Sequence, residues 1–230
     1  MMCGMLMHDA SRPAVAFLQA QPWFAALPAA DRVRVAGATG VITGSRGDVL
    51  LHAGEPVAGW YAVLSGLVKI QSQNADGRLA AFLGVPGGEW LGGGSVMKDE
   101  PRRYDVIALW PTELLCLPRA EFEHLRRTSL TFNHALADHL NLRLAQAMAI
   151  IEAGRIRSPE QRVALALSRM FWHGQRSLAL SQEELAVLAG LARQTVNGIL
   201  KGFERQGLVT LAFGRVGIRD EAGLTALLDG

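Results

Sequence analysis

The feature that most constrains this chain is a series of helix start and stop signals that begins at residue 181. Ser181-Gln-Glu-Glu184 has the pattern of a capping box, in which the side chains of a serine and of a glutamate three residues later each bond the other's backbone amide. A short apolar helix follows and ends at Gly190, and a longer helix then runs from about Ala192 to Gln206. A short helix, a tight glycine turn and a second helix predict a helix-turn-helix.

Two short strands are predicted after the second helix. The segment from Gly207 to Arg219 has apolar runs on either side of a Gly214-Arg215 turn, which predicts a β-hairpin wing. Residues 191–219 contain five basic residues and one acid, Glu204, whereas the whole chain of 230 residues has a net charge of only +2. The basic charge is therefore local, as phosphate binding requires.

The polar face of the second helix has the chemistry that base reading requires. Arginine can donate two parallel hydrogen bonds to guanine, and glutamine or asparagine can pair with adenine. Hydroxyl side chains at helix starts can bind phosphate, helped by the backbone amides there. The pattern therefore predicts a transcription factor that binds double-stranded DNA. Its predicted DNA contacts are Ser181, Arg193, Gln194, Thr195, Asn197, Lys201, Arg205 and Arg215.

Short apolar runs separated by glycines fill residues 38–118. Asp76-Gly77 lies between two of these runs, and Asp-Gly is a strong hairpin signal. Many short strands with regular glycine punctuation predict a small antiparallel roll of the double-stranded β-helix type. Amphipathic fragments in residues 14–36, broken by Pro22 and Pro28, predict short helices before the roll. The predicted fold class is α+β.

Residues 119–153 are nearly free of glycine and proline, so we expect one long helix that Gly154 ends. Apolar residues recur along it at alternating spacings of three and four, which is typical of a coiled-coil seam. The helix is therefore predicted to pair two subunits, and the alternative is that the stripe packs inside its own subunit. The predicted seam is Ala137, Leu140, Leu144, Ala147 and Ile151.

A new helix is predicted to start at Ser158-Pro159-Glu160-Gln161, where serine can cap, proline fits the first helical position and glutamine can reach back. We place a domain boundary and hinge at 154–157. The predicted domains are the N-terminal helices with the roll (15–118), the long helix (119–153) and the winged helix-turn-helix (158–230).

Composition excludes several other classes of protein. Two cysteines, Cys3 and Cys116, cannot form a four-thiolate iron–sulfur site, and they indicate a reducing, cytoplasmic compartment. No apolar run approaches the ~20 residues that span a bilayer, and the first residues lack a signal-peptide core. The six histidines stand singly, which is more typical of core or surface residues than of haem or metal ligands. We therefore expect no metal site, no membrane span and no catalytic centre.

The sequence resembles the CRP/FNR family of bacterial regulators, most closely over LSQEELAVLAGLARQTVNGILKGFERQGLV. Upstream, Gly47-Asp48-Val49-Leu50, Gly54-Glu55, Tyr61 to Gly66 and Gly88-Glu89 resemble the glycine-marked strands of a cyclic-nucleotide-binding roll. The resemblance implies a homodimer in which an effector at the roll reorients two DNA-binding domains through the long helix. It also implies RNA polymerase as a partner.

The resemblance also assigns individual residues of the DNA-reading helix. Arg193 takes the position of the family's base-contacting arginine. Gln194 stands where many members carry glutamate, and Gly198 where some carry another arginine. The operator is therefore expected to be a palindrome related to the family's sites without being identical to them.

The resemblance places the effector in the roll, beside the long helix. Members that bind cyclic AMP follow Gly-Glu-Leu with an Arg-Ser or Arg-Thr pair, but here the pair is Arg102-Arg103. The hydroxyl residues that meet the adenine are replaced by Ala147 and Met148, which would leave purine nitrogens unpaired at about 1–3 kcal/mol each. We therefore hypothesise that cyclic AMP is not the effector. The predicted effector-site residues are Gly88, Glu89, Trp90, Arg102, Arg103, Ala147 and Met148.

Two points stay open at this level. Arg102, Arg103 and the amides of Gly92–Gly94 can hold an anion, or the arginines can simply be solvated beside a flexible connector. The roll could also belong to a small-molecule sensor that works through protein contacts rather than DNA, or to a roll-fold metal enzyme. The effector, the operator, the regulated genes and the choice between activation and repression do not follow from the sequence.

Overall fold

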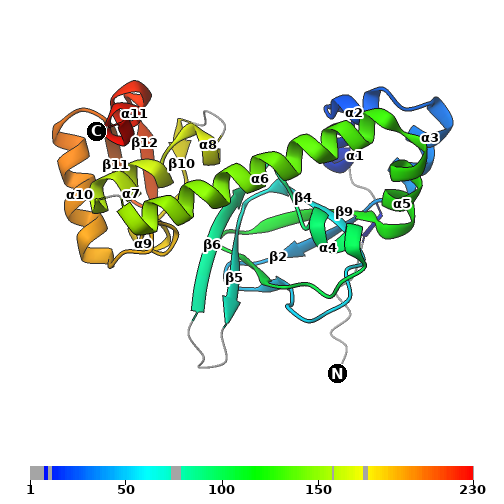
Figure 1. The fold of residues 1–230 in the computed structure, drawn as a ribbon, viewed down its shortest axis with the longest axis horizontal. Coiled ribbons are helices and arrows are strands. Elements are labelled where there is room, and N and C mark those ends of the chain that lie inside the picture. Colours follow the sequence, from blue (N-terminus) through cyan, green and yellow to red (C-terminus); the bar gives the residue numbers. More distant parts are fainter. Residues whose placement is uncertain (1–7, 10–11, 74–78, 157, 173–175, 230) are drawn as a thin grey trace. The chain divides into compact units, whose positions relative to one another are not determined.

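The computed structural model describes residues 8–9, 12–73, 79–156, 158–172 and 176–229. Its contacts divide the chain into two compact units, Met1–Arg143 and Leu144–Gly230. The first unit is the predicted antiparallel roll with short helices before it, and the second contains the predicted winged helix-turn-helix (Figure 1). The α+β fold class is confirmed. No helix in these ranges is long and apolar enough to cross a membrane.

The strands of the roll form two antiparallel sheets (Figure 1). The first sheet has the order β1-β2-β9-β4-β7, and the second has the order β3-β8-β5-β6. The turn predicted at Asp76-Gly77 lies outside the described residues, but the strands on either side of it pair antiparallel from Leu67↔Pro86 to Gln73↔Leu79. The strands are β1 (His8–Asp9), β2 (Gly40–Gly44), β3 (Val49–Leu51), β4 (Gly59–Ser65), β5 (Leu67–Gln73), β6 (Leu79–Pro86), β7 (Trp90–Leu91), β8 (Asp105–Ala108) and β9 (Thr112–Pro118).

Helices surround the roll, and the three short N-terminal helices agree with the prediction for residues 14–36. They are α1 (Arg12–Gln19), α2 (Pro22–Ala25) and α3 (Ala29–Ala38), and α4 (Gly93–Lys98) follows β7. The long helix predicted over 119–153 is instead two helices, α5 (Arg119–Thr128) and α6 (Leu130–Ile156). The break lies at Ser129, whose backbone is extended and whose hydroxyl accepts the amide of Phe132 at 3.2 Å. A serine used as a helix cap is the physical reason for the break.

The prediction that Gly154 ends the long helix is wrong, because α6 continues to Ile156. A glycine inside a helix costs only about 1 kcal/mol relative to alanine, so it need not end one. The division between the two compact units also falls inside α6 rather than at 154–157. The hinge at 154–157 stays a prediction.

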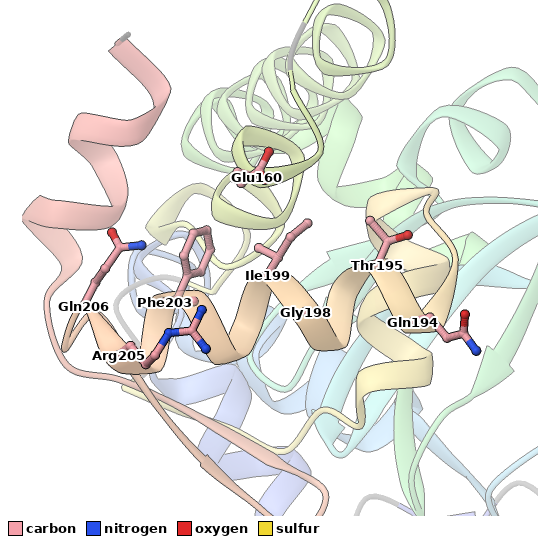
Figure 2. Close-up of a pocket in the computed structure, with 9 residues that line it drawn as sticks. Glu160, Gln194, Thr195, Gly198, Ile199, Phe203, Arg205 and Gln206 are labelled. Atoms are coloured by element: carbon pink, nitrogen blue, oxygen red, sulfur yellow. The ribbon is translucent and has the colours of Figure 1, made fainter.

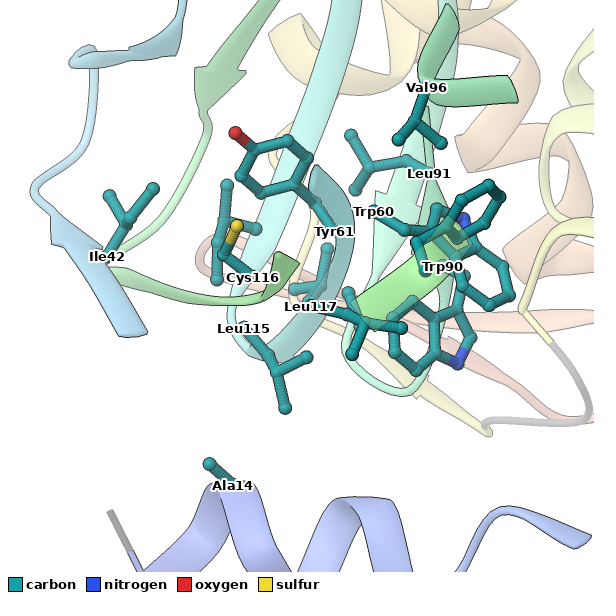
Figure 3. Packing of buried hydrophobic residues seen from close by; sticks show 14 of the residues in the cluster. Ala14, Ile42, Trp60, Tyr61, Trp90, Leu91, Val96, Leu115, Cys116 and Leu117 are labelled. Carbon is teal, nitrogen blue, oxygen red and sulfur yellow. The ribbon is translucent and has the colours of Figure 1, made fainter. Parts of the chain in front are cut away.

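A cluster of aromatic rings lies within the hydrophobic core of the first unit, and Figure 3 shows two of its members, Trp60 and Trp90, among buried aliphatic residues. Trp60 of β4 stacks on Trp90 of β7 with ring centroids 4.1 Å apart and planes 25° apart. Trp23 of α2 lies edge-on to Phe132 of α6 at 5.0 Å, and Trp60 lies edge-on to Phe122 of α5 at 5.8 Å. Such tilted and stacked pairs add about 0.5–1.5 kcal/mol each beyond their burial. The cluster therefore joins the N-terminal helices, the roll and the start of α6.

The second unit is built on two capping boxes, and both predictions of them are confirmed. Ser158 and Gln161 cap each other at the start of α7, and Ser181 and Glu184 do the same at the start of α9. Gly190 closes α9 with φ +63°, a left-handed conformation that glycine adopts without a steric penalty. The helices are α7 (Pro159–Ala166), α8 (Arg169–Trp172), α9 (Gln182–Ala189), α10 (Arg193–Arg205) and α11 (Glu221–Asp229).

The predicted wing is the hairpin of β11 (Val209–Ala212) and β12 (Arg215–Ile218). A third strand, β10 (Ser177–Leu178), pairs with β12 and was not predicted. Two residues carry too little periodicity to be recognised as a strand in sequence.

Candidate nucleic-acid interface and effector pocket

Helix α10 is the candidate nucleic-acid interface, and its two faces differ as the sequence predicts. Val196, Ile199, Leu200 and Phe203 are buried. In Figure 2, Ile199 and Phe203 point from α10 toward α7, whereas Gln194 points away from the helix. By helical spacing Gln194, Lys201 and Arg205 follow one exposed line, and Arg193 lies beside it.

Most of the predicted DNA contacts are accessible in the second unit, including Arg193, Gln194, Thr195, Lys201, Arg205 and Arg215. Two of them differ. Asn197 is half-buried, and its Oδ1 is buried without a hydrogen-bond partner among the described residues. The Ser181 hydroxyl oxygen accepts the Glu184 amide at 3.2 Å, so its first role is to cap α9. DNA contacts by Asn197 and Ser181 stay predictions.

The turn before α10 is fixed by a residue that the sequence analysis did not identify. Arg162 of α7 donates from Nη2 to the carbonyl oxygens of Ala189 at 2.7 Å and Gly190 at 2.8 Å. These are the last carbonyl of α9 and the carbonyl of the glycine that caps it, and carbonyls at a helix end have no partner within the helix. The guanidinium therefore ties the helix-turn-helix to α7. A partner 27 residues away leaves no local signal in the sequence.

A hollow of about 350 Å³ lies beside α10, against the start of α7 (Figure 2). Glycine at 198 leaves open space on the helix, since a Cβ added there would meet nothing within 4 Å. The side chain of Arg205 extends back toward Gly202, where an added Cβ would lie 3.9 Å from its Nη2. The exposed face of α10 is thus uneven, with polar side chains on either side of a gap at Gly198.

In the roll, the structure separates the two arginines that the sequence placed together. Arg102 is only 6% exposed, donates to the His52 carbonyl oxygen at 3.4 Å and lies over the ring of Tyr61 at 5.3 Å. Arg103 is exposed and paired with Glu100. Of the two possibilities left open for this pair, the solvated one describes Arg103, whereas Arg102 is buried, and an anion contact by either arginine stays a prediction.

The neighbours of the buried Arg102 guanidinium decide what it can bind. Within the described residues, no carboxylate lies at ion-pair distance from its guanidinium. Burial raises the pKa of the neighbouring Tyr61 phenol, so Tyr61 stays neutral and does not neutralise the arginine. A buried cation with no acidic partner is costly unless an anion approaches it.

Glu89 has a partner that the sequence analysis did not pair with it. Arg143 of α6 donates from Nη2 to Glu89 Oε2 at 2.9 Å and to the Trp90 carbonyl oxygen at 2.7 Å. The side chains of Arg143 and Glu89 are only 17% and 14% exposed. The pair therefore ties the Gly88–Trp90 turn to α6. In the sequence, His139 and Arg143 interrupt the apolar pattern of α6, which indicates a polar contact there. The pattern does not show that the partner of Arg143 is Glu89, 54 residues away.

The remaining predicted effector residues lie in different places. Gly88 is exposed, whereas the Trp90 indole is packed in the aromatic core and donates to Gln21 Oε1 at 3.2 Å. Glu89 and Trp90 line a hollow of about 470 Å³ between α2 and α6. Ala147 and Met148 are exposed on the part of α6 that belongs to the second unit. Effector contacts by these residues stay predictions.

The predicted dimer seam is mostly exposed. Leu144 is 61% exposed and Ile151 is 51% exposed, and Met148 between them is 59% exposed. Ala137 and Ala147 are exposed as well. Leu140 differs, because it is half-buried and packs against the core of the first unit.

A roll of this topology followed by a winged helix-turn-helix defines a class of transcription regulator. Residues 43–129 match the cyclic nucleotide-binding domain, and residues 161–227 match the Crp-like helix-turn-helix domain. The "Cyclic AMP receptor protein" of Thermus thermophilus is 31% identical over 188 residues, which cover 80% of this chain and 86% of the relative. The chain belongs to the CRP/FNR family of transcription regulators.

Other comparisons agree with this assignment. The "Transcriptional regulator SdrP" of the same organism is 28% identical over 193 residues, which cover 80% of this chain and 91% of the relative. The structure of FixK2 from Bradyrhizobium japonicum has a TM-score of 0.71 at 19% identity and covers 82% of this chain and 96% of that chain, so it supports the fold. Since these relatives are regulators, the chain is not an enzyme, and the roll-fold metal enzyme is ruled out.

Proposed function

We propose that the chain regulates transcription by binding a palindromic DNA operator as a homodimer, with α10 in the major groove. One observation carries the DNA-binding part. Arg193 and Gln194 are exposed at the first turn of α10, and the capped helix α9 and Arg162 fix the turn that presents them. The first turn of a recognition helix is the part that contacts base edges.

Gel-shift titration of Arg193→Ala tests this interface. If Arg193 reads a guanine, its loss should cost about 1–3 kcal/mol and relax specificity at one base pair of each half-site. Arg127→Ala is the matched control, because it removes one exposed arginine from the first unit. Unchanged affinity and specificity of Arg193→Ala on the wild-type operator would refute the major-groove model.

The dimer is supported by the exposed stripe on α6. Leu144, Met148 and Ile151 repeat at spacings of four and three, as the seam of a coiled coil does. Three large apolar side chains on one line of a helix are costly to leave in water. The stripe includes Met148, which the resemblance places at the effector instead.

Analytical ultracentrifugation of Leu144→Glu tests the dimer. A glutamate in the seam should shift the protein from dimer to monomer at micromolar concentration, because each subunit would bury an unpaired charge. Val33→Glu is the control, since Val33 is 75% exposed on α3 and lies off α6. A monomeric wild type, or a Leu144→Glu variant that stays dimeric, would contradict the proposal.

For the effector, we propose an anionic small molecule at Arg102 other than cyclic AMP. The support is a buried guanidinium with no acidic partner in the described residues, together with Ala147 and Met148 at the positions where the family's cyclic AMP binders have hydroxyls. The relative named for cyclic AMP makes that nucleotide the natural competing candidate.

Calorimetric titration of the wild type with cyclic AMP decides between the two. We expect no binding at micromolar concentration, while native mass spectrometry of the purified protein should show a co-purified anion that Arg102→Met loses. Tight cyclic AMP binding would overturn the proposal.

Because its proposed target is chromosomal DNA, we also propose a cytoplasmic location and RNA polymerase as a partner. Co-purification of RNA polymerase with the operator-bound regulator would test the partner.

A further inference from the structure

The tip of the wing carries an aromatic side chain that no described residue of the second unit covers. Phe213 and Gly214 join β11 to β12, and Ala212↔Arg215 is the last paired position. Gly214 has φ +65°, which closes the turn. Phe213 is fully exposed and is the only aromatic residue among the exposed large hydrophobic side chains of the described residues. One exposed apolar side chain is common on a surface, so its surroundings decide what it means.

The hairpin is fixed to the C-terminal end of α10. The Leu211 amide donates to Glu204 Oε1 at 3.0 Å, and the Leu208 amide donates to the Phe203 carbonyl oxygen at 2.9 Å. Val209 is buried at the base of the hairpin, and Val216 is buried one pair before the tip, where Leu178 of β10 pairs with it. The base of the wing is therefore held in place while its tip projects into solvent.

The charge around the tip favours a polyanion. Residues 209–218 contain Arg215, which is exposed directly after the tip, and no acidic residue. Arg219 follows at the base of the hairpin and is also exposed. Glu204, the nearest acid on α10, accepts the wing amide, so its carboxylate serves to position the wing.

The length of α10 indicates which part of DNA the tip would meet. Arg193 and Glu204 are eleven residues apart, which is about 16 Å along a helix. The major groove is about 12 Å wide. If α10 enters that groove end-on by its first turn, the wing attached at Glu204 lies past the groove edge, on the side of the sugar–phosphate backbone and the next minor groove.

We propose that Phe213 inserts into the minor groove beside the major-groove site and wedges at a base step, while Arg215 binds the flanking phosphate. This inference rests on the proposed DNA binding by α10. Apolar wedges flanked by basic residues are a known way to bind the minor groove and kink DNA. The wedge adds specificity at positions that α10 does not touch, because flexible pyrimidine–purine steps are the easiest to open.

The test uses the full chain and a duplex that the wild type selects from a random 40-base-pair pool. Phe213→Ala should bind this duplex about 5- to 30-fold more weakly and bend it less in a circular-permutation gel shift. Its salt dependence should not change, because no charge is lost, whereas Arg215→Ala should lower the salt slope by about one. Phe213→Leu should keep most of the affinity, since leucine also serves as a wedge.

Controls separate this wedge from the reading by α10. Val33→Ala removes another exposed apolar side chain and should change nothing. Phe213 has no buried contacts to lose, so thermal melting of Phe213→Ala should match the wild type. If Phe213→Ala binds and bends the duplex as the wild type does while Arg193→Ala loses binding, the wedge is wrong and DNA binding by α10 still stands. If the wild type selects no sequence, the DNA-binding proposal itself fails.

Discussion

Acid should destabilise the first unit through His139, a half-buried residue of α6. Its ring lies edge-on to Trp60 at 5.5 Å, and burial, with a smaller contribution from Arg143, lowers its pKa from 6.5 to about 3. Arg143 is paired with Glu89, and Asp138 and His134 lie around the same hollow. The folded protein therefore keeps His139 neutral at pH values where the unfolded chain binds a proton.

The sign and the size of the effect follow from this difference. Because the folded pKa lies below the unfolded one, the stabilisation is complete above pH 6.5 and is lost as the pH falls toward 3. Each pH unit in that window is worth at most about 1.4 kcal/mol. Between pH 6.5 and pH 5 the free energy of unfolding should therefore fall by about 1–2 kcal/mol.

Urea unfolding followed by tryptophan fluorescence measures this loss, since four of the five tryptophans lie in the first unit. His139→Phe keeps an aromatic ring against Trp60 without a titrating group, so its stability should change less over this pH range. His134→Gln is the matched control, because His134 lies on the same helix but is exposed. A wild type with constant stability from pH 6.5 to 5, or an equal pH slope in His139→Phe, would refute the reasoning.

Three further substitutions test contacts that stabilise each unit from within. Ser181→Ala should lower the stability of the second unit by about 1 kcal/mol, read from its melting temperature, because the α9 capping box is lost. Gly190→Ala should lower the stability of the second unit by at least about 1 kcal/mol and weaken DNA binding, because φ is +63° and the new Cβ would lie 2.7 Å from Arg162 Nη2. An unchanged melting temperature would contradict this. Arg143→Met should lower the free energy of unfolding of the first unit by about 3 kcal/mol, because the Glu89 carboxylate loses this cation. Adding Glu89→Gln should recover part of this loss, as measured by urea unfolding.

The features that the sequence predicted well are local. Both capping boxes and the Gly190 turn depend on residues within four positions of one another, so spacing alone identifies them. The two faces of α10 follow from helical periodicity in the same way. The break at Ser129 is local too, but the same serine is compatible with a helix interior, and only its bond to the Phe132 amide decides the outcome.

The features that it missed depend on distant contacts. The partners of Arg143 and Arg162 lie 54 and 27 residues away, and nothing near either arginine indicates which group it meets. The different positions of Arg102 and Arg103 depend on how the roll closes around one of them. The same limit applies to Leu140, which belongs to the seam by spacing and to the core by contact.

The contact between Arg162 and the α9–α10 turn affects how this DNA-binding domain can be transplanted and how it can evolve. A graft that carries only residues 180–219 would keep Arg193, Gln194 and the wing, yet it would lose the guanidinium that holds the Ala189 and Gly190 carbonyls. The angle between α9 and α10 would then depend on the host protein. Positions 162 and 190 should also change together among related sequences, because a side chain at 190 would collide with the arginine that fixes the turn.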